Sequence, residues 1–210
     1  MSAADRRAGR RGRLIEAGLR LLGRDGWAAA TVRGVCAEAG LTERYFYESF
    51  AGRAELLQAI FDSVAAEAAA TVLAAVEAAP HDEHAKSRAA IEAFVQMLTD
   101  DRGRATMLIE SVSAPELRAR RADAVTAFAA LISDQGRAFY GPAAVSPKDA
   151  ELTSLALIGA LAELLIAWLD GRLDVSRERL VDHAVELFVA SAPASSADQA
   201  GRKKRRRTSR

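Results

Sequence analysis

The stretch Thr31–Arg53, TVRGVCAEAGLTERYFYESFAGR, predicts two short helices joined by a tight turn. Thr31 is expected to cap the first helix, because a threonine hydroxyl accepts a hydrogen bond from one of the free N–H groups of the first turn. Gly40 provides the break, since glycine adopts the positive φ that a chain reversal needs. Thr42 is expected to cap the second helix in the same way. The stretch therefore predicts a helix-turn-helix.

The second helix is predicted to expose an unusual set of side chains. Phe46 and Phe50 are four residues apart and are expected on one buried face. At about 100° per residue, Arg44 points away from that face, and Tyr45 and Tyr47 lie on its flanks. Such a surface suits a DNA major groove, where arginine pairs with guanine and hydroxyls reach phosphates or base edges. An ordinary helical hairpin with a solvated Arg/Glu face is the alternative that this pattern leaves open.

The whole stretch resembles the DNA-binding domain of the TetR family of bacterial transcriptional repressors, most closely over Arg11 to Ile60. The residues that carry the resemblance are Thr31-Val32-Arg33, Ala39-Gly40-Leu41-Thr42, Tyr47, Phe50, Arg53 and Glu55-Leu56. The resemblance implies that the helix starting at Thr42 is the recognition helix. It also implies that Tyr47 and Arg53 hold the phosphate backbone and that Thr31 does so at the first helix. The predicted DNA-contacting residues are Thr31, Arg33, Thr42, Glu43, Arg44, Tyr45, Tyr47 and Arg53.

Four positions depart from the residues that are usual in this family. Gly34 stands in place of an acidic residue, Cys36 in place of alanine, Ser49 where histidine is common, and Arg53 where lysine is common. Gly34 lowers helix propensity by about 1 kcal/mol relative to alanine. The predicted helix-turn-helix stands, and the stiffness of its first helix, which begins after Thr31, is left open.

Composition and charge narrow the class of protein. Half of the 210 residues are hydrophobic and 6% are aromatic, which favours an all-α fold. The single cysteine excludes an intramolecular disulfide, and five arginines precede Leu14, so a cytoplasmic protein without a signal peptide is expected. Residues 1–56 carry a net charge of +3, residues 57–201 of −9 and residues 202–210 of +7. Positive ends fit a protein that touches a polyanion with its ends.

The order of apolar stripes and stops predicts four segments. Residues 1–10 are expected to be a disordered basic arm, and residues 11–52 an N-terminal three-helix DNA-binding domain whose first helix covers about 11–24. Residues 53–191 are expected to form a C-terminal helical domain for ligand binding and dimerisation. Its helices are predicted at about 53–79, 84–98, 102–113, 115–140, 147–171 and from 176 to just before Pro193. Residues 192–210 are expected to be a disordered basic tail that adds salt-dependent DNA affinity.

Residues 152–169 are apolar nearly all round. Their length is at the lower edge for crossing a bilayer, and Glu163 disfavours that placement, so no membrane is expected. A helix buried on both sides is expected instead, forming with the last helix a four-helix bundle across a two-fold axis. The TetR resemblance places the homodimer interface there too, and a central helix of a monomer is the alternative. The predicted interface residues are Leu155, Ile158, Leu161, Leu165, Trp168, Leu180 and Phe188.

The TetR resemblance also implies an effector pocket in the helices that follow the long one at 53–79. Its predicted walls are Phe94, Val95, Leu98, Met107, Glu110, Ser111 and Phe128, for which plain core packing is the alternative. Apolar walls favour a small hydrophobic or amphipathic effector. His81 and His84 have no third ligand in the pattern, and neither a metal nor another cofactor is expected.

These patterns support a homodimeric, ligand-responsive repressor that binds a palindromic operator in double-stranded DNA through its helix-turn-helix. An architectural DNA binder that uses both basic ends, without an effector, is the alternative. Serine, histidine and acidic residues occur in no nucleophile-elbow, Walker or metal-ligand spacing, so an enzyme is not expected.

Overall fold

The computed structural model describes residues 2–141 and 145–191, and every regular element in these ranges is helical. The predicted all-α fold is therefore confirmed. The elements are α1 (Ala3–Asp25), the 3₁₀ helix η1 (Trp27–Ala29), α2 (Val32–Ala39), α3 (Glu43–Tyr47), α4 (Arg53–Ala78), α5 (Glu83–Asp100), α6 (Arg102–Glu110), the 3₁₀ helix η2 (Pro115–Leu117), α7 (Arg118–Tyr140), α8 (Pro147–Leu169) and α9 (Arg177–Ala190). The predicted basic tail lies outside the described residues.

Helix α1 begins eight residues earlier than predicted, at Ala3. The Ser2 hydroxyl accepts a hydrogen bond from the Asp5 N–H at 3.0 Å, and the Asp5 carboxylate accepts one from the Ser2 N–H at 2.7 Å. These hydrogen bonds lower the pKa of Asp5. The prediction of a disordered arm over residues 1–10 is thus wrong for residues 3–10. A reciprocal cap starts the helix, and the alanines and arginines that follow have high helix propensity.

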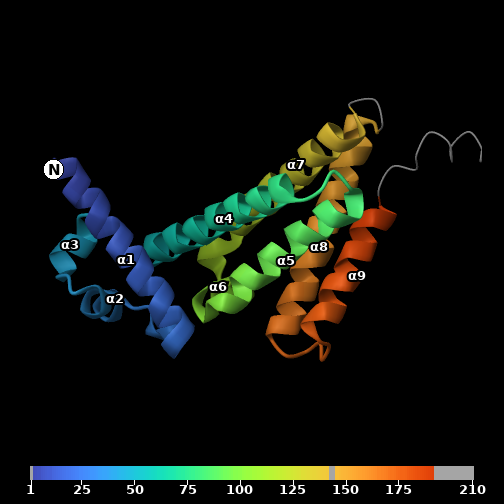
Figure 1. Cartoon of the computed structure of the whole chain (residues 1–210). Helices are drawn as coiled ribbons and strands as arrows, with labels where there is room; N and C mark the ends of the chain where they lie inside the picture. The colour runs from blue at the N-terminus through green and yellow to red at the C-terminus, as the bar shows by residue number, and fades with distance from the viewer. Residues whose placement is uncertain (1, 142–144, 192–210) are drawn as a thin grey trace, which may run out of the picture.

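The first hydrophobic core lies under the helix-turn-helix. α1 packs there against α2, α3 and the first turns of α4 (Figure 1), with Phe46, Phe50 and Leu56 among the fully buried side chains. The same core continues into Met107 of α6 and Leu117 of η2. α4 therefore belongs to both parts of the molecule, although the predicted domain boundary places all of it in the C-terminal domain.

Two glycines let α1 and α6 approach each other closely. A Cβ added to Gly103 would lie 2.3 Å from the carbonyl oxygen of Leu19, and one added to Gly23 would lie 2.7 Å from the backbone nitrogen of Gly103. No other residue type fits at this backbone contact without movement of one of the helices. The contact joins the DNA-binding unit to the body.

The second hydrophobic core fills the body. There α5 packs against α4 and α9, and α7 packs along α8 (Figure 1). Val95, Leu165 and Val185 are among its fully buried side chains. The body therefore has a core of its own, which extends away from the helix-turn-helix.

The two most apolar helices, α4 and α8, are long and apolar enough to cross a membrane by length and composition alone. Core helices of soluble proteins pass the same test. In this structure both helices pack against neighbours: α4 against α5, and α8 against α7.

Candidate nucleic-acid interface and ligand cavity

The turn between α2 and α3 is built as the sequence predicts, with one exception. The Thr31 hydroxyl accepts a hydrogen bond from the Gly34 N–H at 3.0 Å, which caps α2. Gly40 follows α2 with φ of +61°, in the left-handed region that favours glycine. Thr42 occupies the N-cap position of α3, but its hydroxyl accepts no cap hydrogen bond. The predicted side-chain cap at Thr42 is therefore wrong.

Gly34 is required by the packing of this turn. A Cβ at this position would lie 2.7 Å from the carbonyl oxygen of Ala29 and 3.1 Å from the Thr31 hydroxyl. An acidic residue, which is common at this position in the resembling family, would therefore push η1 away from α2. The close approach explains a departure that the sequence leaves without a reason.

The outward side of the helix-turn-helix carries the predicted DNA-reading side chains. Phe46 is fully buried beneath α3, whereas the side chain of Arg44 is 84% exposed and Tyr47 is 58% exposed. Arg33 of α2 is exposed too, and its guanidinium lies 4.0 Å from the Glu43 carboxylate of α3. The remaining predicted residues that lie exposed on this side are Thr31, Thr42 and Tyr45. Seven of the eight predicted residues are therefore accessible on one unit.

Arg53 is the exception, because its guanidinium is turned back into the protein. Its Nε donates to the carbonyl of Ala30 at 2.9 Å, and Nη2 donates to the carbonyl of Trp27 at 2.9 Å. Nη1 lies 3.4 Å from the Glu116 carboxylate, and the guanidinium lies over the Trp27 ring. Arg53 thus joins the start of α4 to η1 and η2. These contacts argue against the predicted phosphate contact of Arg53, because its Nε, Nη1 and Nη2 atoms each have a partner within the protein.

Sequence reasoning did not assign Arg7 and Arg10 to α3, which they contact from the first turns of α1. Arg7 donates to the carbonyl of Glu48, and Arg10 lies 3.2 Å from the Glu48 carboxylate. The Arg10 guanidinium also lies 4.6 Å from the centre of the Tyr45 ring. The charge and spacing of the arginines are visible in the sequence, but their partner lies about forty residues away and is set by folding.

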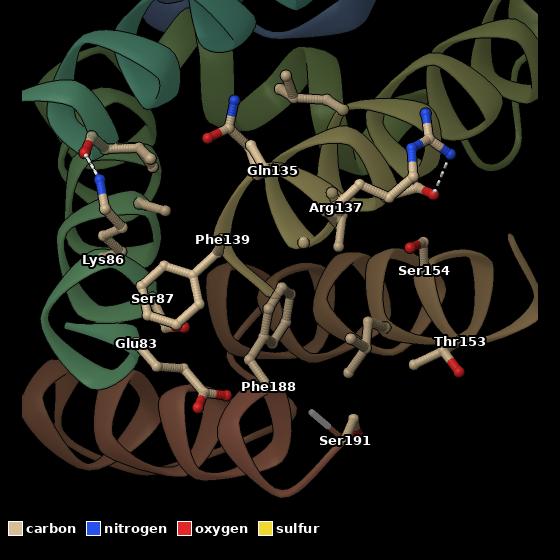
Figure 2. A pocket seen from close by; sticks show the side chains of 18 of the residues that line it. Glu83, Lys86, Ser87, Gln135, Arg137, Phe139, Thr153, Ser154, Phe188 and Ser191 are labelled. Atoms are coloured by element: carbon tan, nitrogen blue, oxygen red, sulfur yellow. Dashed lines mark hydrogen bonds between the residues drawn. The ribbon is translucent and has the colours of Figure 1, made fainter. Parts of the chain in front are cut away.

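The body contains a cavity of about 460 Å³ between α4, α5, α7, α8 and α9 (Figure 2). Its walls are largely aliphatic and aromatic, and Phe139 and Phe188 both project toward it. Phe94 and Phe128, which were predicted as pocket walls, also line it. This cavity is large enough for a small organic molecule.

The other predicted pocket residues lie elsewhere. Met107 and Ser111 line a second cavity of about 80 Å³, and Phe94 and Phe128 line both cavities. Leu98 lines the smaller cavity too, and Glu110 lines neither of the two. The prediction is therefore corrected, and its physical reason is the packing of α6. Met107 is held in the core beneath α1, so α6 cannot form a wall of the larger cavity.

Polar groups occur at the end of the cavity where α4, α5 and α7 meet. Lys86 donates from Nζ to the carbonyl of Val76 at 2.7 Å, as Figure 2 shows. Burial, followed by a hydrogen bond to Glu83, raises the pKa of Tyr140 well above its usual value. The phenol is protonated at neutral pH, as a tyrosine ordinarily is, and it donates its hydrogen bond to Glu83. Among the described residues, no group of three or more His, Cys, Asp or Glu side chains could hold a metal ion.

Most of the predicted interface residues are turned into the protomer. Ile158, Leu161, Leu165 and Leu180 are buried in it, and the Trp168 indole donates to the carbonyl of Val175 at 3.0 Å. Phe188 lines the larger cavity. Only Leu155 is well exposed. The predicted set is therefore corrected, because the face of α8 that carries most of it forms the protomer's own core.

The helix-turn-helix and its attached helical body define a DNA-binding protein of two parts. Residues 14–60 match the family model described as bacterial regulatory proteins, tetR family. This match confirms that the N-terminal part of the chain resembles the DNA-binding domain of the TetR family of transcriptional regulators, as the sequence predicts. This family consists generally of soluble, non-enzymatic DNA-binding regulators.

Solved structures share this fold over most of the chain. A TetR-family transcriptional regulator from Streptomyces coelicolor is 19% identical with a TM-score of 0.69, and the match covers 91% of this chain and 82% of that one. The fatty acid degradation regulator FadR from Bacillus halodurans is 17% identical with a TM-score of 0.69, covering 85% and 94%. The multidrug binding protein EbrR, solved with imidazole, is 24% identical with a TM-score of 0.65, covering 89% and 97%. No curated protein matches the chain.

Proposed function

We propose that this regulator is a homodimeric repressor that binds a palindromic operator and is released from it by a small apolar or amphipathic effector. The observation that carries the proposal is the position of α4. Leu56 and Ile60, in its first turns, lie in the core beneath the helix-turn-helix, whereas Val72 and Val76 line the larger cavity. At 1.5 Å per residue, its 26 residues extend over about 39 Å. One continuous helix thus joins the two candidate sites.

An effector in the cavity would contact α4, α5, α7 and α8 together. It would favour an arrangement in which the two recognition helices of a dimer no longer match the spacing of their half-sites. To weaken DNA binding a hundredfold, the effector needs about 2.7 kcal/mol of differential affinity for that arrangement. The contact of Gly103 with α1 gives the body a second hold on the DNA-binding unit.

The lining of the cavity supports an apolar or amphipathic effector. Its walls are mainly hydrocarbon, and the Glu83–Tyr140 pair offers a polar anchor in place of Glu110. We expect Ala90→Phe, which fills the cavity, to leave operator binding intact and to abolish release by effector. Ala66→Phe, on an exposed part of α4, is the matched control and should respond as the wild type does. Equal responses of the two variants would rule out the cavity as the effector site.

The exposed side of α8 is the proposed dimer interface. Leu152, Leu155, Ala156 and Ala160 are exposed at helical spacing on this helix, and Leu187 is exposed on α9. Small and leucine side chains at such spacing suit the packing of helices across a two-fold axis. This stripe replaces the buried residues that the sequence predicted.

Selection from a pool of random duplexes tests the DNA-binding part of the proposal. We expect an inverted repeat whose half-sites are one helical turn, or a multiple of it, apart. Arg44→Ala and Tyr45→Ala should each weaken binding to the selected duplex by about 1–3 kcal/mol and relax its sequence preference. Arg118→Ala, which removes an exposed charge from α7, is the control for net charge. Unchanged specificity in both α3 variants would contradict the proposed recognition surface.

The same experiment separates this function from that of an architectural DNA binder. Such a protein would show little sequence preference, and its binding would largely disappear after removal of residues 202–210. An inverted repeat that is still selected by the shortened chain excludes it.

A further inference from the structure

We propose that the first turns of α1 form a brace for the recognition helix, in which Arg10 is a positioning residue for Tyr45 and Arg44 and not a contact to DNA phosphate. The inference rests on the proposed function in one respect, namely that α3 reads the DNA. It assigns a role to an arginine-rich segment that its charge alone would assign to the phosphate backbone.

Helix α3 needs support from outside itself. It has five residues, Glu43 to Tyr47, whereas isolated helices shorter than about 12–15 residues are marginal in water. Phe46 and Phe50 hold it from below. The last carbonyl groups of any helix also lack intrahelical partners, and cationic side chains stabilise that end.

The arginines of α1 supply both kinds of support. Arg7 and Arg10 are three residues apart and therefore lie on one side of the helix. Arg7 donates to the carbonyl of Glu48, the residue that ends α3. Arg10 pairs with Oε2 of the Glu48 carboxylate at 3.2 Å. Arg11, next in sequence, lies 4.9 Å from the centre of the Phe50 ring. The end of α3 is thus held from α1 at several points.

Glu48 transmits this support to the DNA-reading side chains. Its Oε1 accepts a hydrogen bond from Arg44 Nε at 3.3 Å, while Oε2 pairs with Arg10. The Arg10 guanidinium also covers one face of the Tyr45 ring, at 4.6 Å from its centre. Arg10 therefore positions Tyr45 directly and Arg44 through Glu48. It also neutralises the Glu48 carboxylate, which would otherwise repel DNA.

The orientation of Arg10 argues against a direct phosphate contact. Its side chain is half-buried between α1 and α3, and its Nε is fully buried. Its Nη2 is already hydrogen-bonded to Glu48. Arg44, in contrast, is largely exposed and could leave Glu48 for DNA without uncovering an unpaired carboxylate, because Arg10 remains.

A double-mutant cycle on the duplex obtained by selection tests the brace. We expect Arg10→Ala to weaken binding about tenfold, because it removes an ion pair and a cation–π contact together. In a Glu48→Ala background the same change should weaken binding only about twofold, because only the contact with Tyr45 remains to be lost. Arg20→Ala removes an α1 arginine that pairs with Glu38 of α2, and it serves as the control. Equal tenfold losses in both backgrounds would show a phosphate contact and overturn the brace.

Hydrogen–deuterium exchange provides a second readout that needs no DNA. Arg10→Ala should speed the exchange of the amides of residues 43–50 at least fivefold and leave the amides of α5 and α9 unchanged. Unchanged exchange at residues 43–50 would overturn the brace even if the DNA results agreed with it. If the wild-type chain enriched no duplex from the random pool, the proposed function would be contradicted. The exchange data would still decide whether α1 braces α3.

Discussion

The substitution Gly103→Ala tests the close contact between the DNA-binding unit and the body. A Cβ at residue 103 would lie 2.3 Å from the carbonyl oxygen of Leu19 and 3.0 Å from Oδ1 of Asp101. Ordinary contacts of a Cβ begin at 3.4 Å, so α1 and α6 would have to separate by about 1 Å. The added methyl group therefore acts on the packing of two helices whose backbones touch.

The expected effect is a destabilisation of about 1–3 kcal/mol, the usual range for overpacking in a well-packed core. The gain in helix propensity offsets little of this, because residue 103 lies in the first turn of α6. For a chain of this size, about 1 kcal/mol corresponds to about 2–4 °C in Tm. Thermal unfolding followed by circular dichroism should therefore show a loss of about 2–12 °C in Tm.

Gly136→Ala is the matched control. Gly136 lies inside α7, and a Cβ there would meet nothing within 4 Å. The same change of residue should therefore raise stability by up to about 1 kcal/mol through helix propensity. If both variants were at least as stable as the wild type, the close α1–α6 contact would be refuted.

Three further predictions concern other parts of the molecule. Arg53→Ala should lower the free energy of unfolding by about 2 kcal/mol, because it leaves two carbonyl groups without their charged donor. Thermal unfolding in the absence of DNA measures this loss. An unchanged Tm together with weaker DNA binding would show that Arg53 contacts a phosphate instead. Leu155→Glu, at a residue 46% exposed, should give monomers in light scattering without loss of protomer stability, and a dimer that persists would exclude the proposed stripe on α8. Cys36 is buried, and burial raises the pKa of its thiol. A disulfide reagent should therefore modify this thiol much more slowly in the native protein than in the denatured protein. Equal rates would contradict its burial.

The local structure of the DNA-binding unit could be predicted from neighbouring residues. Thr31, Gly40 and the Phe46–Phe50 pair act on partners within four residues, and their patterns predict a cap, a turn and a buried face that the structure contains. The start of α1 was missed for a different reason. Its reciprocal cap uses Asp5, whereas the pattern sought at helix starts has Glu or Gln at that position.

The candidate sites are harder to predict, because an apolar stripe along a helix does not show which element, ligand or second protomer packs against it. Glu110 and Met107 have the residue types of a pocket wall, but the glycine contact of α6 with α1 places Met107 in the core under the helix-turn-helix. Ile158 and Leu165 have the residue types of an interface, but α8 is apolar on several sides and turns these two inward. When several faces of a helix are equally apolar, the sequence does not show which of them is buried within the protomer.

The sequence by itself determined that this chain is helical, that its N-terminal part contains a helix-turn-helix, and which side of α3 is exposed. These properties depend on backbone preferences and on periodicities of a few residues. Only the tertiary structure decided that Arg53 turns inward, that Arg7 and Arg10 hold α3, and that the cavity lies against the last turns of α4. The physical reason is that each of these depends on partners from distant parts of the chain, such as Glu116 for Arg53 and Glu48 for Arg10, which only packing brings within range.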